Sequence, residues 1–132
     1  LAVLFGLHCP GGVMTCDITP DGLGDPHILD LHRRLGVRFE RADCRDPAVA
    51  ARMVSRLARP RFILCDDGDK PAEFALYAGL LESGDMIAVH DVGSEFFPDA
   101  PETQAVVARH GLVRWRANEV EERSLLAFWT TR

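Results

Sequence analysis

Short apolar runs alternate along this chain with helical segments that begin beside a proline. Strand-like runs occupy residues 13–18, 37–41, 61–65 and 86–89. The helical patterns between and after them start at Asp25-Pro26, Asp46-Pro47, Pro71 and Pro101, and Asp followed by Pro supplies an N-cap and a favoured first helical residue. This alternation is typical of a doubly wound α/β fold, so we expect a mostly parallel sheet with helices on both faces.

The two ends of the chain depart from the alternation. Residues 112–117 and 124–130 are strand-like runs joined by a short polar segment, which favours a C-terminal antiparallel hairpin over a crossover. We expect Trp115 and Trp129 on these runs to pack as cross-strand core residues. Residues 1–7 are apolar but too few for periodicity to separate a strand from a helix end. We expect residues 1–132 to form a single domain.

Composition excludes several classes of protein. The chain is 47% hydrophobic and 27% charged, as globular domains are, and no apolar run reaches the length of a membrane span. The net charge of -5 argues against nucleic-acid and membrane partners, so four clustered arginines are interpreted as solvated surface: Arg33, Arg34, Arg38 and Arg41. Cys9, Cys16, Cys44 and Cys65 show neither a CxxC pair nor zinc spacing, so we expect a reduced, cytoplasmic protein.

Acidic residues follow several of the expected strands. The run 61–65 leads into Asp66-Asp67-Gly68-Asp69-Lys70, and the run 86–89 leads into His90-Asp91. Parallel strands bring their carboxyl ends to one edge, where open α/β sheets bind ligands. Asp17 and Asp43 follow two earlier strands. Acids gathered at one edge would repel one another unless a cation or a hydroxyl-rich ligand lies among them.

Residues 62–70, the helix with Phe74 and Tyr77, and residues 81–91 together resemble class I S-adenosylmethionine-dependent methyltransferases. The resemblance is strongest to the cephalosporin-hydroxylase-like branch and more distant to the metal-dependent catechol and caffeoyl-CoA O-methyltransferases. It covers most of the chain, and it implies a Rossmann-like fold whose final strand is antiparallel. It also implies an enzyme that methylates a hydroxyl group of a small molecule.

The resemblance further implies roles for particular residues. Asp17 would hold the ribose hydroxyls of the cofactor, Asp43 and Cys44 would flank its adenine, and Asp66 would match the first acid of the metal-dependent members. His90 and Asp91 would match their second acidic pair and take the catalytic roles. Asp66, His90 and Asp91 would then bind Mg²⁺, and the imidazole leaves room for Mn²⁺ or Zn²⁺.

One part of the family pattern is missing, namely the glycine-rich loop after the first strand. Residues 1–8 match the helix that follows that loop, so we expect the first strand and its glycines to precede residue 1. A sheet without its first strand has a gap that another chain or segment must fill. The alternative function is therefore a non-catalytic methyltransferase-like domain that serves as an oligomer or complex partner, including a homo-oligomer.

Each candidate site residue also has a purely structural interpretation. One of Asp66, Asp67 and Asp69 can cap the helix that starts at Pro71, and His90-Asp91 can be a salt-bridged loop pair. Asp17 can be a turn acid before Pro20-Asp21-Gly22, and Cys44 can be an ordinary thiol.

Four other features of the sequence are weaker indications of a functional site. Lys70 is expected on the surface and His110 at a helix end that favours a cation, so neither is given a catalytic role. Gly22-Leu23-Gly24 resembles a dinucleotide fingerprint, but His27 stands at the third glycine position, and acids at Asp21 and Asp25 would oppose a pyrophosphate. Residues 93–100, with Phe96, Phe97 and Pro98, are a candidate substrate lid or a packed surface loop.

Overall fold

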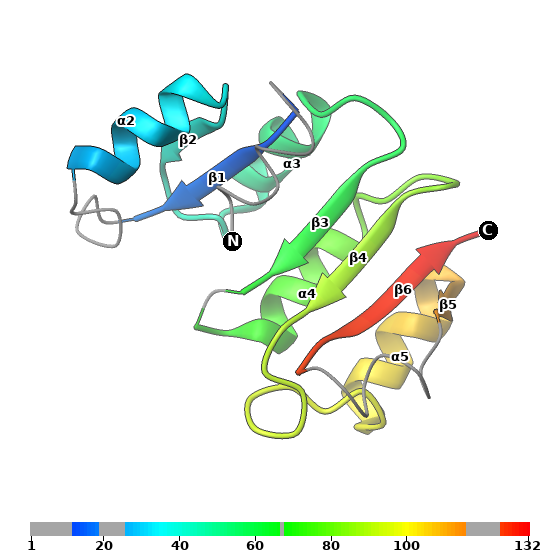
Figure 1. Ribbon diagram of the computed structural model, residues 1–132. Coiled ribbons are helices and arrows are strands. Elements are labelled where there is room, and N and C mark those ends of the chain that lie inside the picture. Colours follow the sequence, from blue (N-terminus) through cyan, green and yellow to red (C-terminus); the bar gives the residue numbers. More distant parts are fainter. Residues whose placement is uncertain (1–11, 19–25, 67, 116–124) are drawn as a thin grey trace. The chain divides into compact units, whose positions relative to one another are not determined.

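The computed structural model describes residues 12–18, 26–66, 68–115 and 125–132, without the side chains of Pro26 and Ile28 (Figure 1). The chain divides into two compact units, Leu1–Ala58 and Arg59–Arg132. Several features named above lie outside the described residues: the run 1–7, the Gly22-Leu23-Gly24 segment, the cap Asp25, Cys9 and Asp67.

Among its described residues, the first unit contains a parallel strand pair and two helices. β1 (Met14–Asp17) pairs in parallel with β2 (Arg38–Arg41), as expected for strands joined by a helix. The helices are α2 (Pro26–Arg34) and α3 (Pro47–Ser55). Asp46 caps α3 by accepting from the N–H groups of Ala48 at 2.7 Å and Val49 at 3.3 Å, which confirms the start that Asp-Pro predicts.

The residues that α2 buries differ in part from those that the sequence pattern predicts. An apolar stripe of Ile28, Leu31 and Leu35 is the natural expectation for α2, yet Leu31 is 40% exposed and His32 is buried at 4%. Successive residues of an α-helix are about 100° apart around its axis. Leu31 therefore does not follow the apolar stripe that its spacing predicts.

The second unit is built on a four-stranded mixed sheet in the order β3-β4-β6-β5. β3 (Phe62–Cys65) is parallel to β4 (Met86–Val89), and β6 (Ala127–Thr131) is antiparallel to both β4 and β5 (Leu112–Arg114). The predicted C-terminal antiparallel pair is thus confirmed. The prediction of a mostly parallel sheet is wrong here, because the single reversed strand β6 lies between two others and makes two of the three pairings antiparallel.

In the part of this unit that the structure describes, two helices cover one face of the sheet. α4 (Lys70–Ala78) packs on β3 and β4, α5 (Pro101–His110) packs on β5, and the two helices contact each other. Between helices and sheet lies an aromatic core in which Trp129 contacts Phe74 and Phe96, with ring centroids 4.8 Å and 5.8 Å away.

Trp129 is fully buried, as predicted, whereas Trp115 is 40% exposed. Trp115 packs on Phe128, the strand neighbour of Trp129, and neighbours along a strand face opposite sides.

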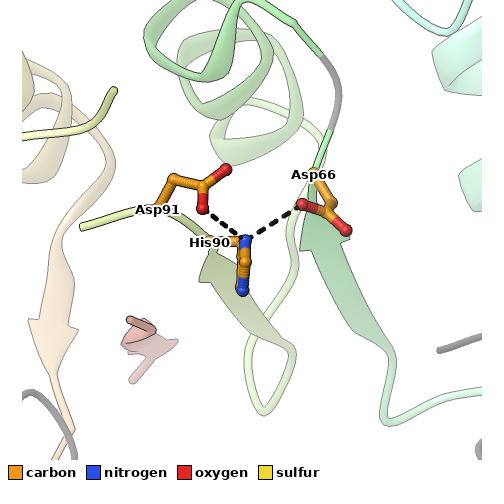
Figure 2. A group of neighbouring side chains, drawn as sticks. All are labelled: Asp66, His90 and Asp91. Atoms are coloured by element: carbon orange, nitrogen blue, oxygen red, sulfur yellow. Dashed lines mark ion pairs between the residues drawn. The ribbon is translucent and has the colours of Figure 1, made fainter. Parts of the chain in front are cut away.

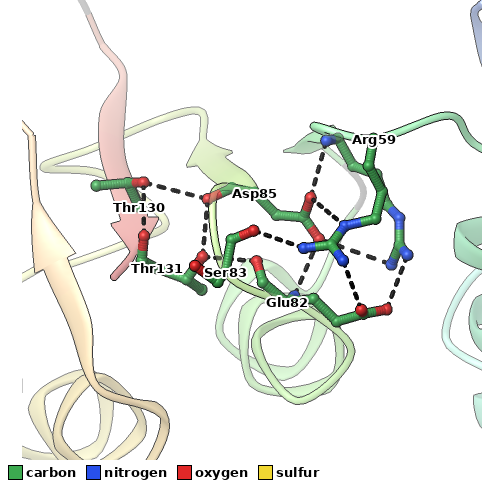
Figure 3. Close-up of polar contacts among 7 residues, drawn as sticks. Arg59, Glu82, Ser83, Asp85, Thr130 and Thr131 are labelled. Carbon is green, nitrogen blue, oxygen red and sulfur yellow. Dashed lines mark hydrogen bonds and ion pairs between the residues drawn. The ribbon is translucent and has the colours of Figure 1, made fainter.

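A polar network holds the strand ends of this unit in register (Figure 3). Asp85, directly before β4, is fully buried, and its carboxylate accepts from the backbone N–H groups of Arg61 and Glu82 at 2.9 Å each. Its carbonyl oxygen accepts from the backbone N–H of Thr131 at 3.2 Å. The network therefore ties the amino ends of β3 and β4 to the carboxyl end of β6, and Cys65 and Val89 become register partners at the far edge.

No helix in the described part of the chain is long and apolar enough to cross a membrane.

Candidate functional site

The carboxyl ends of β3 and β4 finish level with each other, and the candidate residues emerge from them side by side. The backbone N–H of His90 donates to the carbonyl of Cys65 at 3.1 Å, which extends the strand pairing by one residue. Asp66 follows β3, and His90 and Asp91 follow β4 (Figure 2). We call Asp66, His90 and Asp91 the edge cluster. The structure brings these three together, as the placement of acids after parallel strands predicts.

The imidazole of His90 lies between the two carboxylates. Its Nδ1 is 2.9 Å from Asp91 Oδ1 and 3.3 Å from Asp66 Oδ1. Nδ1 is buried, although the side chain as a whole is 37% exposed, and no described residue meets it with hydrogen-bond geometry. A buried ring nitrogen without a hydrogen bond costs free energy unless a bound group such as a cation contacts it.

Lys70 joins the edge cluster from the first position of α4. Its side chain is only 4% exposed, and its Nζ lies 3.0 Å from Asp91 Oδ2 and 2.7 Å from Glu95 Oε2. The expectation that Lys70 is a surface residue is therefore wrong, and both Lys70 and Glu95 were missed as site residues. A signal was present, because a cation at a helix N-terminus opposes the helix dipole and needs carboxylates nearby.

Lys70 and Asp91 hold each other in the charged state. Burial alone would lower the pKa of Lys70, but hydrogen bonds to Glu95 and Asp91 outweigh it and raise the pKa above its ordinary value. The hydrogen bond from Lys70 lowers the pKa of Asp91, against the opposing effect of desolvation, and His90 adds to the lowering. A charged ammonium and a charged carboxylate therefore face each other at neutral pH.

The turn that begins at Asp91 fixes the backbone of the site. Asp91 has φ 59°, a left-handed conformation that Asp tolerates better than most residues. Its carbonyl oxygen accepts from the backbone N–H groups of Ser94, Glu95 and Phe96 at 3.2, 3.0 and 3.2 Å. Phe96 is fully buried against Phe74, with ring centroids 5.3 Å apart. The packed-loop interpretation of residues 93–100 thus holds for Phe96, whereas Phe97 is 54% exposed.

The acids after β3 have separate roles. Asp69 caps α4 by accepting from the N–H of Ala72 at 3.2 Å, so the capping interpretation is confirmed for this residue. Asp66 lies beside His90 instead. The interpretation of His90-Asp91 as a loop ion pair is compatible with the geometry, although Asp91 also binds Lys70.

The remaining candidates lie at the carboxyl ends of β1 and β2 in the first unit. Asp17 ends β1, and its carbonyl accepts from the N–H of Ala42 at 3.1 Å. Asp43 Oδ1 accepts from the N–H of Arg45 at 2.9 Å, so Asp43 stabilises its own turn. Cys44 is buried at 7%.

The donor atoms of the edge cluster can hold a divalent cation. One atom each from Asp66, His90 and Asp91 lie within 4.8 Å of one another. Ligands about 2.1 Å from a six-coordinate cation are about 3 Å apart when they occupy neighbouring positions. The distances of 2.9 Å and 3.3 Å from His90 Nδ1 match that spacing, and the donor set is one nitrogen and two carboxylate oxygens.

No known protein family and no curated protein matches this chain.

Proposed function

We propose that this protein is an S-adenosylmethionine-dependent methyltransferase that acts, with the help of a divalent cation, on a hydroxyl group of a small molecule. The observation that carries the proposal is the edge cluster at the carboxyl ends of the parallel strands β3 and β4. Ligands of open α/β sheets bind outside the carboxyl ends of their strands.

The order of the strands also supports the proposal. The last strand, β6, is antiparallel to its neighbours and lies between β4 and β5. The methyltransferases that the sequence resembles also finish their sheet with an antiparallel strand. The proposal accordingly includes the Rossmann-like, doubly wound fold that this resemblance implies.

The proposal assigns the cofactor to residues at the ends of β1 and β2. Asp17 would accept hydrogen bonds from the ribose hydroxyls, because one carboxylate can accept from two vicinal donors. Asp43 and Cys44 would flank the adenine. The resemblance also gives Asp66, after β3, a role in binding the cofactor and the cation.

The edge cluster supplies the chemistry toward the acceptor. A cation held by Asp66, His90 and Asp91 would polarise the acceptor hydroxyl and make its oxygen easier to deprotonate. Methyl transfer is an in-line displacement, so the main task of these side chains is to keep the acceptor oxygen in position. Lys70 contributes by fixing the carboxylate of Asp91.

The test is a calorimetric titration with S-adenosylhomocysteine, with and without Mg²⁺. Asp17→Ala should abolish binding, while Asp30→Ala, which removes an exposed acid paired with Arg34 in the same unit, should not. The titration is repeated on a version extended upstream of Leu1 where the gene encodes further residues. Absence of binding by both versions would sink the methyltransferase proposal and favour the non-catalytic alternative.

A further inference from the structure

The carboxylate of Asp91 is divided between two partners. Its Oδ2 lies 3.0 Å from Lys70 Nζ, and its Oδ1 lies 2.9 Å from His90 Nδ1. Only Oδ1 therefore faces the other donors of the edge cluster. A cation among Asp66, His90 and Asp91 would receive one oxygen from Asp91.

The position of Lys70 allows it to keep Asp91 Oδ2 away from the other donors of the edge cluster. Its side chain is 4% exposed, so it has little freedom to swing into solvent. Glu95 Oε2 holds the same ammonium at 2.7 Å, and the backbone N–H of Glu95 donates to the carbonyl of Asp91 at 3.0 Å. Lys70, Asp91 and Glu95 thus form one closed unit of contacts, and rotation of the Asp91 carboxylate would break its 3.0 Å ion pair with Lys70.

We propose that Lys70 determines which divalent cations the edge cluster accepts, by limiting Asp91 to a single oxygen ligand. This inference rests on the metal-assisted function proposed above. Ca²⁺ takes 6–8 oxygen ligands at about 2.3–2.6 Å and often binds a carboxylate through both oxygens. Smaller six-coordinate cations accept single carboxylate oxygens, and those of the transition series also accept imidazole nitrogen. The edge cluster should therefore select a cation such as Mn²⁺ against Ca²⁺.

A purely electrostatic role of Lys70 has a different consequence. An ammonium near a metal site repels every divalent cation by the same charge, so its removal would strengthen Mn²⁺ and Ca²⁺ binding in parallel. A role in ligand geometry instead changes the ratio of the two affinities. The ratio of Mn²⁺ affinity to Ca²⁺ affinity therefore distinguishes the two roles of Lys70. Its measurement does not depend on enzymatic activity.

The experiment measures Mn²⁺ affinity by electron paramagnetic resonance and Ca²⁺ affinity by competition at neutral pH. The wild-type chain should bind Mn²⁺ at least about tenfold tighter than Ca²⁺. Lys70→Met, which is uncharged and of similar length, should free Asp91 Oδ2 and lower this ratio by about tenfold. Lys70→Arg keeps a cation at Oδ2, and Asp99→Asn removes an exposed carboxylate that pairs with Arg114 outside the edge cluster, so both should retain the wild-type ratio. Circular dichroism verifies the fold of each variant.

Three results would overturn the inference. Equal affinities of the wild-type chain for Mn²⁺ and Ca²⁺, or no binding of either, would do so even if Lys70→Met failed to fold. A folded Lys70→Met variant with an unchanged ratio would assign Lys70 a structural or purely electrostatic role. The titration with S-adenosylhomocysteine judges the methyltransferase proposal separately, because cofactor binding and cation selectivity are read independently.

Discussion

Replacement of Asp85 tests how the second unit holds the strands that carry the edge cluster. Asp85 is fully buried, and its two carboxylate oxygens accept separate backbone N–H groups, from Arg61 and from Glu82. The guanidinium groups of Arg59 and Arg61 lie 3.7 Å and 3.6 Å away. Asp85→Ala would leave both backbone donors without an acceptor and both cations without this carboxylate.

The expected loss follows from these contacts. A donor left unsatisfied inside a protein costs about 1–3 kcal/mol, and the two donors here are partly buried, so about 1–2 kcal/mol each is appropriate. The ion pairs are longer than 3.5 Å, and partly exposed pairs add about 0.5 kcal/mol each. Asp85→Ala should therefore destabilise the chain by about 3–5 kcal/mol, a large part of the stability of an ordinary domain.

The assay is urea unfolding followed by tryptophan fluorescence, since Trp129 is fully buried in the same sheet. Glu82→Gln is the matched control, because Glu82 faces the same two arginines at 2.8 Å but its side chain is 56% exposed. The control should lose at most about 1 kcal/mol. A similar loss in both variants would refute the reasoning, because charge would then matter more than the buried hydrogen bonds. Loss below about 1 kcal/mol for Asp85→Ala would refute it as well.

Two further predictions concern other carboxylates. Asp69→Ala removes the cap of α4 and should cost about 1 kcal/mol in urea unfolding. It should leave Mn²⁺ affinity unchanged, and a loss of cation binding would instead place Asp69 in the site. The pKa of Glu40 is lowered, chiefly by the hydrogen bond from Arg52, so its stabilising effect is present above the ordinary value of 4.5 and disappears as the pH falls through the lower folded-state pKa. The free energy of unfolding, measured with urea, should therefore fall less between about pH 7 and about pH 3 in Glu40→Gln than in the wild-type chain. Asp30 also pairs with an arginine, and an equally small fall in Asp30→Asn would contradict this explanation.

Local signals in the sequence predicted most elements of the fold. Asp46-Pro47 marks the start of α3, and the apolar run 86–89 matches β4 to the residue. Such signals work because caps, prolines and apolar runs act within a few residues of the backbone that they shape. They also predicted that Asp66 and His90 would be neighbours, because parallel strands of similar length end at one edge.

Long-range contacts decided the rest. Chain order alone does not show that β6 lies between β4 and β5, and this placement makes the sheet mostly antiparallel in its pairings. Leu31 is 40% exposed and His32 is buried, which the hydrophobicity of these residues does not predict.

The sequence by itself determined that acids and a histidine stand at the ends of two neighbouring strands. Only the tertiary structure decided that Lys70 is a buried partner of Asp91, since its environment depends on Glu95, a residue 25 positions along the chain. The burial and the ion pairs of a side chain depend on the residues that pack around it in the folded protein. A lysine side chain is long and flexible, so it can extend into solvent or toward a carboxylate, and only the tertiary packing decides between the two.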